Sequence, residues 1–350
     1  MIYNNSQKKA VMHTTGPMMV LAGPGSGKTA VITGRTCQLV TSGISASRIL
    51  VVTFTRAAAK EMKERYLKAM GKTSTQVTFG TFHGVFYAIL RHTYRMSGNN
   101  ILSEEEKKRL MRELVNHYAR DLEEEDLEEN LAREISTVKN NQIPLEHYYS
   151  ACMPQEKFRE IYEAYEKWRK ENKKLDFDDL MVQCKRLFLE RPEVLRAWQQ
   201  KFQYILIDEF QDISPVQYEI VRMLALPENN LFIVGDDDQS IYQFRGAKPE
   251  IMLNFPKDYP GAAQVVLDKN YRSTEFIVKR SQCLIHHNKK RYEKAISTDN
   301  EKGAPVAIRG YKNPREEMRA VAEELREAEK KTKAAGAALT KARTEAARRL

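Results

Sequence analysis

The stretch Met18-Met19-Val20-Leu21-Ala22-Gly23-Pro24-Gly25-Ser26-Gly27-Lys28-Thr29 decides the fold of this 350-residue chain. Its first five residues are apolar, a glycine-rich turn follows, and apolar residues at helical spacing come after the turn. This pattern predicts a buried strand, a phosphate-binding loop and a helix. Glycines let consecutive backbone N–H groups turn towards phosphate oxygens, and the N-terminus of the helix adds the positive end of a dipole. The sequence therefore predicts binding of a nucleoside triphosphate.

Each end of the loop carries residue types with an expected role. Lys28 is placed for the β- and γ-phosphates, and the Thr29 hydroxyl for Mg²⁺. Ala22 stands where the strict pattern has glycine, and alanine is small enough to leave the loop intact. The alternative, a glycine turn followed by a solvated lysine, is disfavoured by the strand and helix on either side. The predicted nucleotide-binding residues of the loop are Ala22, Gly23, Pro24, Gly25, Ser26, Gly27, Lys28 and Thr29.

Composition indicates a soluble, charge-rich globular protein, with 42% hydrophobic and 30% charged residues. No apolar run approaches the length of a membrane span, and residues 1–5 do not resemble the start of a signal peptide. The four cysteines are widely separated and form no CxxC pair, which favours a reducing compartment over a zinc site or disulfide framework. A cytoplasmic protein without a membrane partner is expected. The net charge of +10 permits a polyanionic partner without requiring one.

Strand-like and helical patterns alternate along much of the chain. Further apolar runs occupy residues 49–55, 76–79, 204–207, 231–234 and 264–267. Helical patterns precede the first strand at residues 4–11 and follow the second at 56–62. Alternation of this kind predicts a parallel α/β sheet whose ligand site lies at the carboxyl ends of the strands.

From about residue 91 to residue 200, charged helical sequence replaces the strand pattern, which predicts a helical insertion into the α/β domain. Ser103 before three glutamates predicts one helix start, and Asp176 predicts another. The carboxylates of Asp176, Asp178 and Asp179 could bind a metal, but acids that cap a helix are the favoured explanation. The acidic stretch 121–129 is expected to be solvated, because it would repel a phosphate backbone.

Polar residues at three later strand ends complete the predicted site. Asp208 can hold Mg²⁺ beside the phosphate loop, and Glu209 can orient or deprotonate the attacking water, so hydrolysis is the chemistry implied. Gln239 follows the strand at 231–234 and can sense the γ-phosphate, while Arg272 can approach the triphosphate as an arginine finger. Tyr242, Phe244 and Arg245 offer stacking and charge to a single-stranded base, although Tyr242 could equally pack in a core.

From about Asn4 to Thr274, these ordered motifs closely resemble the N-terminal portion of UvrD/Rep-type superfamily 1A DNA helicases, their ATP-binding domain. The resemblance implies that Gln7 recognises adenine, that Tyr271 stacks on it, and that Arg272 contacts the γ-phosphate. It also implies that Gln239 couples the γ-phosphate to DNA. The single-strand track implied by the resemblance contains Thr53, Phe54, Thr55, Thr81, Phe82, His83, Tyr242, Phe244 and Arg245.

The resemblance implies a RecA-like P-loop parallel sheet with a helical insertion domain and an incomplete start of a second RecA-like domain. The first RecA-like domain is expected at residues 1–90 and 201–265, and the helical DNA-binding subdomain at 91–200. Residues 266–350 are expected to begin the second domain and to end in a truncated, basic, alanine-rich tail. The chain departs from the family pattern at Ala30 (usually arginine), Phe244 (usually tryptophan) and Phe210 (usually tyrosine).

The function implied is that of an ATP-dependent 3′–5′ DNA helicase and translocase, present as an N-terminal part, with ATP and Mg²⁺ as cofactors. Single-stranded and partially duplex DNA are the expected partners. The alternative is a non-catalytic or regulatory module that binds ATP and DNA. A phosphate-loop kinase is disfavoured, because it would leave the aromatic and arginine residues at 242–245 without a role.

Overall fold

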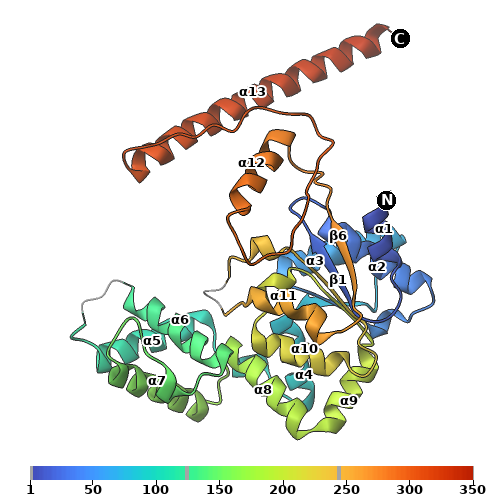
Figure 1. Ribbon diagram of the computed structural model, residues 1–350. Coiled ribbons are helices and arrows are strands. Elements are labelled where there is room, and N and C mark those ends of the chain that lie inside the picture. Colours follow the sequence, from blue (N-terminus) through green and yellow to red (C-terminus); the bar gives the residue numbers. More distant parts are fainter. Residues whose placement is uncertain (1–2, 123–125, 243–245, 350) are drawn as a thin grey trace. The chain divides into compact units, whose positions relative to one another are not determined.

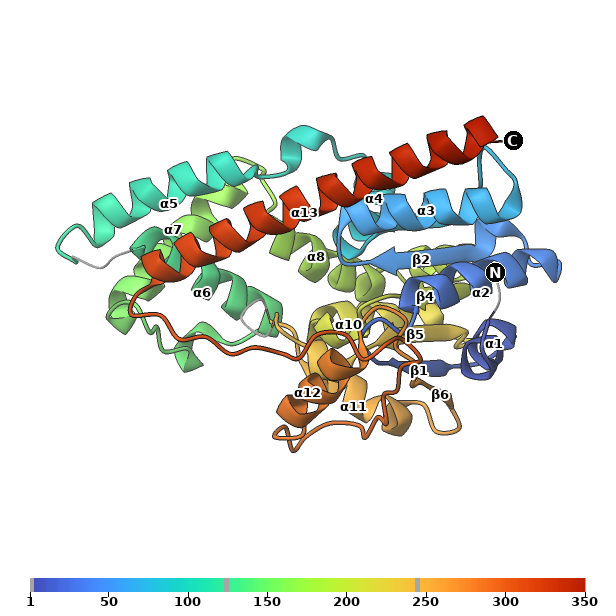
Figure 2. The ribbon, with the colours of Figure 1, turned by 90° about the horizontal axis from the view of Figure 1, so that it is seen from above.

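The computed structural model describes residues 3–122, 126–242 and 246–349, which divide into two units, Met1–Lys302 and Gly303–Leu350. Within the described part of the first unit, a six-stranded sheet has the order β3-β2-β4-β5-β1-β6, and all its pairings are parallel. Figure 1 labels two of its strands, β1 and β6. The strands are β1 (Met18–Ala22), β2 (Ile49–Thr53), β3 (Thr78–Thr81), β4 (Tyr204–Ile207), β5 (Leu231–Gly235) and β6 (Ala263–Leu267). Figure 2 shows β2, β4, β5, β1 and β6 side by side in this order. The predicted parallel α/β sheet is confirmed.

Helices cover both faces of the sheet, because successive side chains of a strand point to opposite faces. In β1, Met19 and Leu21 join one hydrophobic core, whereas Met18 and Val20 join the other. The first core includes side chains of α4 (Phe82–Tyr94), α8 (Phe177–Glu190), α10 (Pro215–Ala225) and α11 (Pro249–Asp258). The second includes side chains of α1 (Asn5–Met12), α2 (Lys28–Thr41) and α3 (Arg56–Met70). Burial on both faces explains why the strands are apolar runs without alternation.

The helical insertion has a third core of its own, and Figure 1 shows its helices as a group beside those that cover the sheet. This core is formed mainly by α5 (Glu104–Tyr118), α6 (Leu127–Asn141) and α7 (Gln155–Glu171). The predicted helix starts are confirmed, since Ser103 and Asp176 each form a capping box at the N-terminus of a helix. The carboxylates of Asp176 and Asp179 also pair with Lys139, which compensates for their burial.

The remaining described elements are short or lie near the carboxyl end. They are α9 (Pro192–Lys201), α12 (Glu275–Ile285), α13 (Pro314–Arg349), η1 (Ala46–Arg48), η2 (Gly98–Asn100), η3 (Leu145–His147), η4 (Phe210–Asp212) and η5 (Asp237–Gln239). Helix α13, in the second unit, agrees with the helix propensity of the alanine-rich tail. The domain limits stay a prediction, and β6 spans the limit expected at residue 265. Among the described helices, none is both long and apolar enough to cross a membrane.

Candidate functional site

The loop after β1 is closed by its own backbone and tied to the edge strand β6. The N–H of Gly23 donates to the carbonyl of Leu267 at 3.2 Å. The N–H and the hydroxyl of Ser26 both donate to the carbonyl of Gly23, at 3.3 and 2.6 Å. Helix α2 then begins at Lys28, directly after Gly27 in the left-handed conformation. The structure thus forms the strand, tight loop and helix that the sequence predicts, with Ala22 as the last residue of the strand.

Two glycines of the loop allow close approach by distant segments. Gly25 has φ +64°, and a Cβ on it would lie 2.8 Å from the Cβ of Arg272. Gly27 has φ +89°, and a Cβ there would lie 2.9 Å from Nε2 of Gln7. Residues with a Cβ rarely adopt these backbone conformations. Both positions therefore require glycine, first because of the positive φ and second because a Cβ would clash with a neighbouring side chain. The structure therefore brings the loop, the first helix and the segment after β6 into contact.

Gln7 and Tyr271, the residues predicted at the adenine, lie at the same end of the loop. Nε2 of Gln7 donates to the carbonyl of Ser26 at 2.9 Å, while its Oε1 accepts from the N–H of Asn4 at 3.2 Å. Nδ2 of Asn4 donates to the hydroxyl of Tyr271 at 2.8 Å, and the N–H of Tyr271 donates to the carbonyl of Gly25 at 3.0 Å. Half of the Tyr271 side chain is exposed, so its ring is accessible for stacking.

Asn270 holds the predicted arginine finger against the loop, a role that sequence reasoning missed. Its Nδ2 donates to the carbonyl of Pro24 at 2.7 Å. Its Oδ1 accepts from the N–H groups of Arg272 and Ser273, at 2.8 and 2.7 Å. An asparagine that bonds the backbone two residues later forms an Asx turn, and this local pattern could have identified it.

The acidic end of β4 meets the loop through an ion pair. Nζ of Lys28 lies 2.5 Å from Oε2 of Glu209, which also accepts from Nε2 of Gln211 at 2.9 Å. Glu209 has φ +51°, an unusual conformation for a non-glycine residue that often accompanies functional sites. Burial, followed by the charge of Glu209, raises the pKa of Asp208 to about 6. Thr29 lies in the first turn of α2 and is half-buried.

Gln239 is connected to this ion pair through a second glutamine. Nε2 of Gln239 donates to Oδ2 of Asp236 at 2.6 Å, and the N–H of Asp236 donates to Oε1 of Gln211 at 2.9 Å. Gln211 in turn contacts Glu209. Sequence reasoning missed Gln211 and Asp236, because both looked like ordinary loop residues, Gln211 after β4 and Asp236 after β5.

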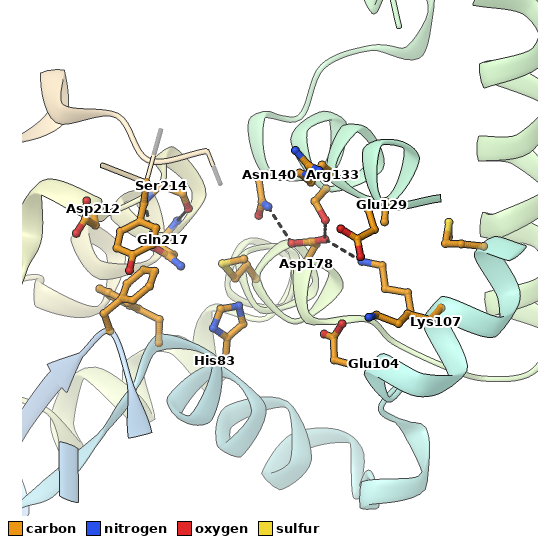
Figure 3. Close-up of a pocket in the computed structure, with 18 of the residues that line it drawn as sticks. His83, Glu104, Lys107, Glu129, Arg133, Asn140, Asp178, Asp212, Ser214 and Gln217 are labelled. Atoms are coloured by element: carbon orange, nitrogen blue, oxygen red, sulfur yellow. Dashed lines mark hydrogen bonds and ion pairs between the residues drawn. The ribbon is translucent and has the colours of Figure 1, made fainter. Parts of the chain in front are cut away.

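A cavity of about 860 Å³ separates residues of the α/β core from residues of the helical insertion. Figure 3 shows Asp212, Ser214 and Gln217 on one side, and Lys107, Glu129 and Arg133 on the other. Phe54, Phe82, His83 and Tyr242 of the predicted single-strand track line the cavity. The rings of Phe54 and Tyr242 stack, while His83 meets Phe177 edge-on with centroids 5.6 Å apart. Burial lowers the pKa of His83.

Other predicted track residues have structural roles. The hydroxyls of Thr55 and Thr81 cap α3 and α4 by accepting from the N–H groups of Ala58 and Gly84. Thr53 is buried, and its hydroxyl donates to the carbonyl of Thr55 at 2.9 Å. Phe82, although it lines the cavity, is largely buried in the core against the sheet. Phe244 and Arg245 lie outside the described residues.

The insertion adds polar residues to the cavity, and sequence reasoning did not place any of them there. Asp178 accepts from Nδ2 of Asn140 at 2.8 Å, and Nζ of Lys107 lies 3.9 Å from it (Figure 3). Arg133 projects from α6 on the same side. Lysines and arginines on charged helices look alike in sequence, so nothing marked these as facing a cavity.

Two family models match the chain. One is described as the UvrD/REP helicase N-terminal domain and matches residues 3–260, and the other as the UvrD-like helicase C-terminal domain and matches residues 265–348. The chain is 43% identical over 300 residues to the putative ATP-dependent DNA helicase YjcD of Bacillus subtilis, covering 84% of the chain and 39% of the relative. It is 39% identical over 311 residues to the ATP-dependent DNA helicase PcrA of Leuconostoc citreum, covering 87% and 41%.

A probable DNA helicase II homolog of Mycoplasma capricolum is 36% identical over 336 residues, which cover 93% of the chain and 46% of that relative. The chain therefore spans less than half the length of each of these three relatives.

Proposed function

Because the chain belongs to the UvrD/REP helicase family, we propose that it is part of an ATP-dependent DNA helicase and translocase. The observation that carries this proposal is the 2.5 Å ion pair between Lys28 and Glu209, which joins the phosphate loop to the acidic strand end. Relatives named as ATP-dependent DNA helicases support ATP and DNA as the substrates. The 3′ to 5′ direction of movement follows from the family resemblance.

The loop residues hold the triphosphate. Gly25 and Gly27 give the backbone the positive φ values that turn N–H groups inward, and α2 presents its N-terminus to the phosphates. We assign Gln7 and Tyr271 to the base, because both contact the loop and the half-exposed ring of Tyr271 can stack on it. Asn270 accepts from the backbone N–H of Arg272, which keeps this residue beside the loop, and we assign its guanidinium to the γ-phosphate.

Thr29 and Asp208 fit a magnesium ion. Their hydroxyl and carboxylate oxygens are the ligand types that Mg²⁺ takes at phosphate sites. Asp208 is buried, which raises its pKa, and a divalent cation beside its carboxylate would offset the cost of that burial. When bound, the ion neutralises negative charge on the β- and γ-phosphates. With a pKa of about 6, the Asp208 carboxyl is mostly ionised at neutral pH, so it supplies a negative charge at a fixed position beside the loop.

Glu209 acts as the base for the attacking water. In the structure, the Lys28 ammonium and the Gln211 amide both bind the same oxygen of Glu209. A triphosphate in the loop competes for Lys28, because its charge is larger than that of one carboxylate. Glu209 is then released to accept a proton from water, while Gln211 keeps its side chain oriented.

The cavity between the α/β core and the insertion is the proposed path of single-stranded DNA. The half-exposed rings of Phe54 and Tyr242 offer a surface on which bases can stack. Lys107 and Arg133 on the opposite side can contact phosphates. Single-stranded and partially duplex DNA are accordingly the proposed partners.

Steady-state ATP hydrolysis with and without oligo-dT tests the proposal. Hydrolysis stimulated by the oligonucleotide and abolished by Glu209→Gln is expected. Glu193→Gln, which alters an exposed carboxylate that pairs with Arg191, is the matched control and should retain turnover. Binding of ATP and DNA without stimulated turnover would instead favour the non-catalytic module. Failure to bind ATP would contradict both functions.

A further inference from the structure

The turn after β5 contains three consecutive acids, Asp236, Asp237 and Asp238, whose carboxylates converge on one lysine. Nζ of Lys294 lies 2.8 Å from Oδ1 of Asp236 and 2.8 Å from Oδ2 of Asp238, and it also bonds Asp237. The side chains of Lys294 and Asp236 are 1% and 0% exposed. Three carboxylates that converge can suggest a metal site, but here the ammonium group takes the position of the cation.

A second cation from the same segment reinforces the arrangement. Arg291 binds Asp238 with two hydrogen bonds, from Nε at 2.7 Å and from Nη2 at 2.8 Å. The N–H of Tyr292 donates to Oδ2 of Asp237 at 2.7 Å. Buried carboxylates need such partners, because desolvation without compensation costs several kcal/mol for each ion. The conformation of the acidic turn therefore depends on residues 291–294.

The acidic turn is bonded to the proposed hydrolytic residues. Oδ1 of Asp236 accepts from Nζ of Lys294 at 2.8 Å, and its Oδ2 accepts from Nε2 of Gln239 at 2.6 Å. Its N–H donates to Gln211, and Gln211 donates to Glu209. One continuous series of contacts thus leads from Lys294 through Asp236 to both Gln239 and Glu209.

We propose that Lys294 is a positioning residue of the nucleotide site, which orients Gln239 and Gln211 by holding Asp236. This inference rests on the proposed function. It assigns Lys294 to recognition of the γ-phosphate, because Gln239 and Glu209 act at that end of the nucleotide. It also means that the segment matched to the C-terminal family model contributes to the site of the first RecA-like domain.

The test compares the affinity of the full chain for MgADP and MgATPγS, measured by competition with a fluorescent ADP. The unmodified chain is expected to prefer the triphosphate analogue. In Lys294→Met that preference should fall by about tenfold, the size expected when Gln239 loses one charge-assisted hydrogen bond to the γ-phosphate. The affinity for ADP should stay unchanged. Lys294→Arg should restore the preference. Lys279→Met, which removes the exposed ion pair of Lys279 with Glu275 on α12, is the matched control.

A purely structural lysine would lower affinity for both nucleotides, or for neither. A second readout is the double variant Gln239→Ala/Lys294→Met, whose preference should be no lower than that of Gln239→Ala alone. If Lys294→Met fails to fold, Gln211→Ala tests the same series of contacts with the ion pairs intact, and it should also lose the preference.

Two results contradict the inference while leaving the proposed function standing. One is a triphosphate preference retained in Lys294→Met or, if that variant does not fold, in Gln211→Ala. The other is equal affinity of the unmodified chain for the two nucleotides. An unmodified chain that binds neither nucleotide contradicts the proposed function itself.

Discussion

The ring of Phe54 stacks on the ring of Tyr242, with centroids 5.0 Å apart and planes inclined by 24°. Phe54 follows directly after β2, whereas Tyr242 lies beyond β5. Both rings are half-buried and line the cavity that faces the helical insertion. The sequence also allowed Tyr242 to pack in a hydrophobic core, and the structure shows that it does not.

Removal of one ring of this pair should weaken binding of single-stranded DNA. Tyr242→Ala is expected to cost roughly 1–3 kcal/mol of binding free energy, the usual contribution of one base stacked on an aromatic side chain. Fluorescence anisotropy with labelled oligo-dT measures this loss. Tyr242→Phe should bind nearly as well as the unmodified chain, and Tyr149→Ala removes a tyrosine that is 76% exposed and lies outside the cavity lining. If Tyr242→Ala bound oligo-dT with unchanged affinity, the proposal that single-stranded DNA follows this cavity would be wrong.

Addition of one methyl group to the phosphate loop should abolish nucleotide binding. In Gly25→Ala the new Cβ would lie 2.8 Å from the Cβ of Arg272, so either the loop or the arginine must move. Gly43→Ala is the control, because Gly43 also has positive φ (+94°) but an added Cβ meets no described atom within 4 Å. Both variants should lose about 1 kcal/mol of unfolding free energy from backbone strain. Titration with fluorescent ADP should detect a loss of affinity in Gly25→Ala alone.

Lys139 should be essential for the stability of the insertion. Its ammonium lies 2.7 Å from carboxylate oxygens of both Asp176 and Asp179 and 3.1 Å from Glu166, with the side chain only 5% exposed. Lys139→Met leaves these acids without their shared partner and should destabilise the protein by about 3–5 kcal/mol. Lys60→Met, which removes an exposed pair with Glu64, should cost less than about 1 kcal/mol. Urea unfolding measures both, and equal midpoints would contradict the assignment.

The contribution of His83 to stability should fall as the pH drops below the ordinary pKa of histidine. Burial lowers the pKa of His83 in the folded state, and the nearby charge of Asp178 offsets this only in part. Below about pH 6.5, His83 therefore takes up a proton in the unfolded chain before it does so in the folded chain, so its contribution to the unfolding free energy decreases with falling pH. His83→Gln should reduce this slope between pH 7 and pH 5 in urea unfolding. The control is His147→Gln, a change at an exposed histidine, and a slope unaltered by His83→Gln would refute the prediction.

Most of the fold could be predicted from patterns among residues that are neighbours in the sequence. The strands are runs of apolar residues, and the helix starts at Ser103 and Asp176 follow from capping chemistry within four consecutive residues. The loop at 22–29 is equally local, because its glycines and its following helix are contiguous in sequence. Patterns of this kind are visible without knowledge of the tertiary structure.

The sequence by itself determined the phosphate loop, the alternation of strands and helices and the helical insertion, because these patterns depend on neighbours along the chain. The pairing of the strands joins residues as distant as Met18 and Phe232. Only the tertiary structure decided which side chains meet. The contacts of Lys28 with Glu209, of Asn270 with Pro24 and of Lys294 with Asp236 join residues far apart in sequence. The physical reason is that buried polar groups must find partners, and the folded geometry alone determines which partners are within reach.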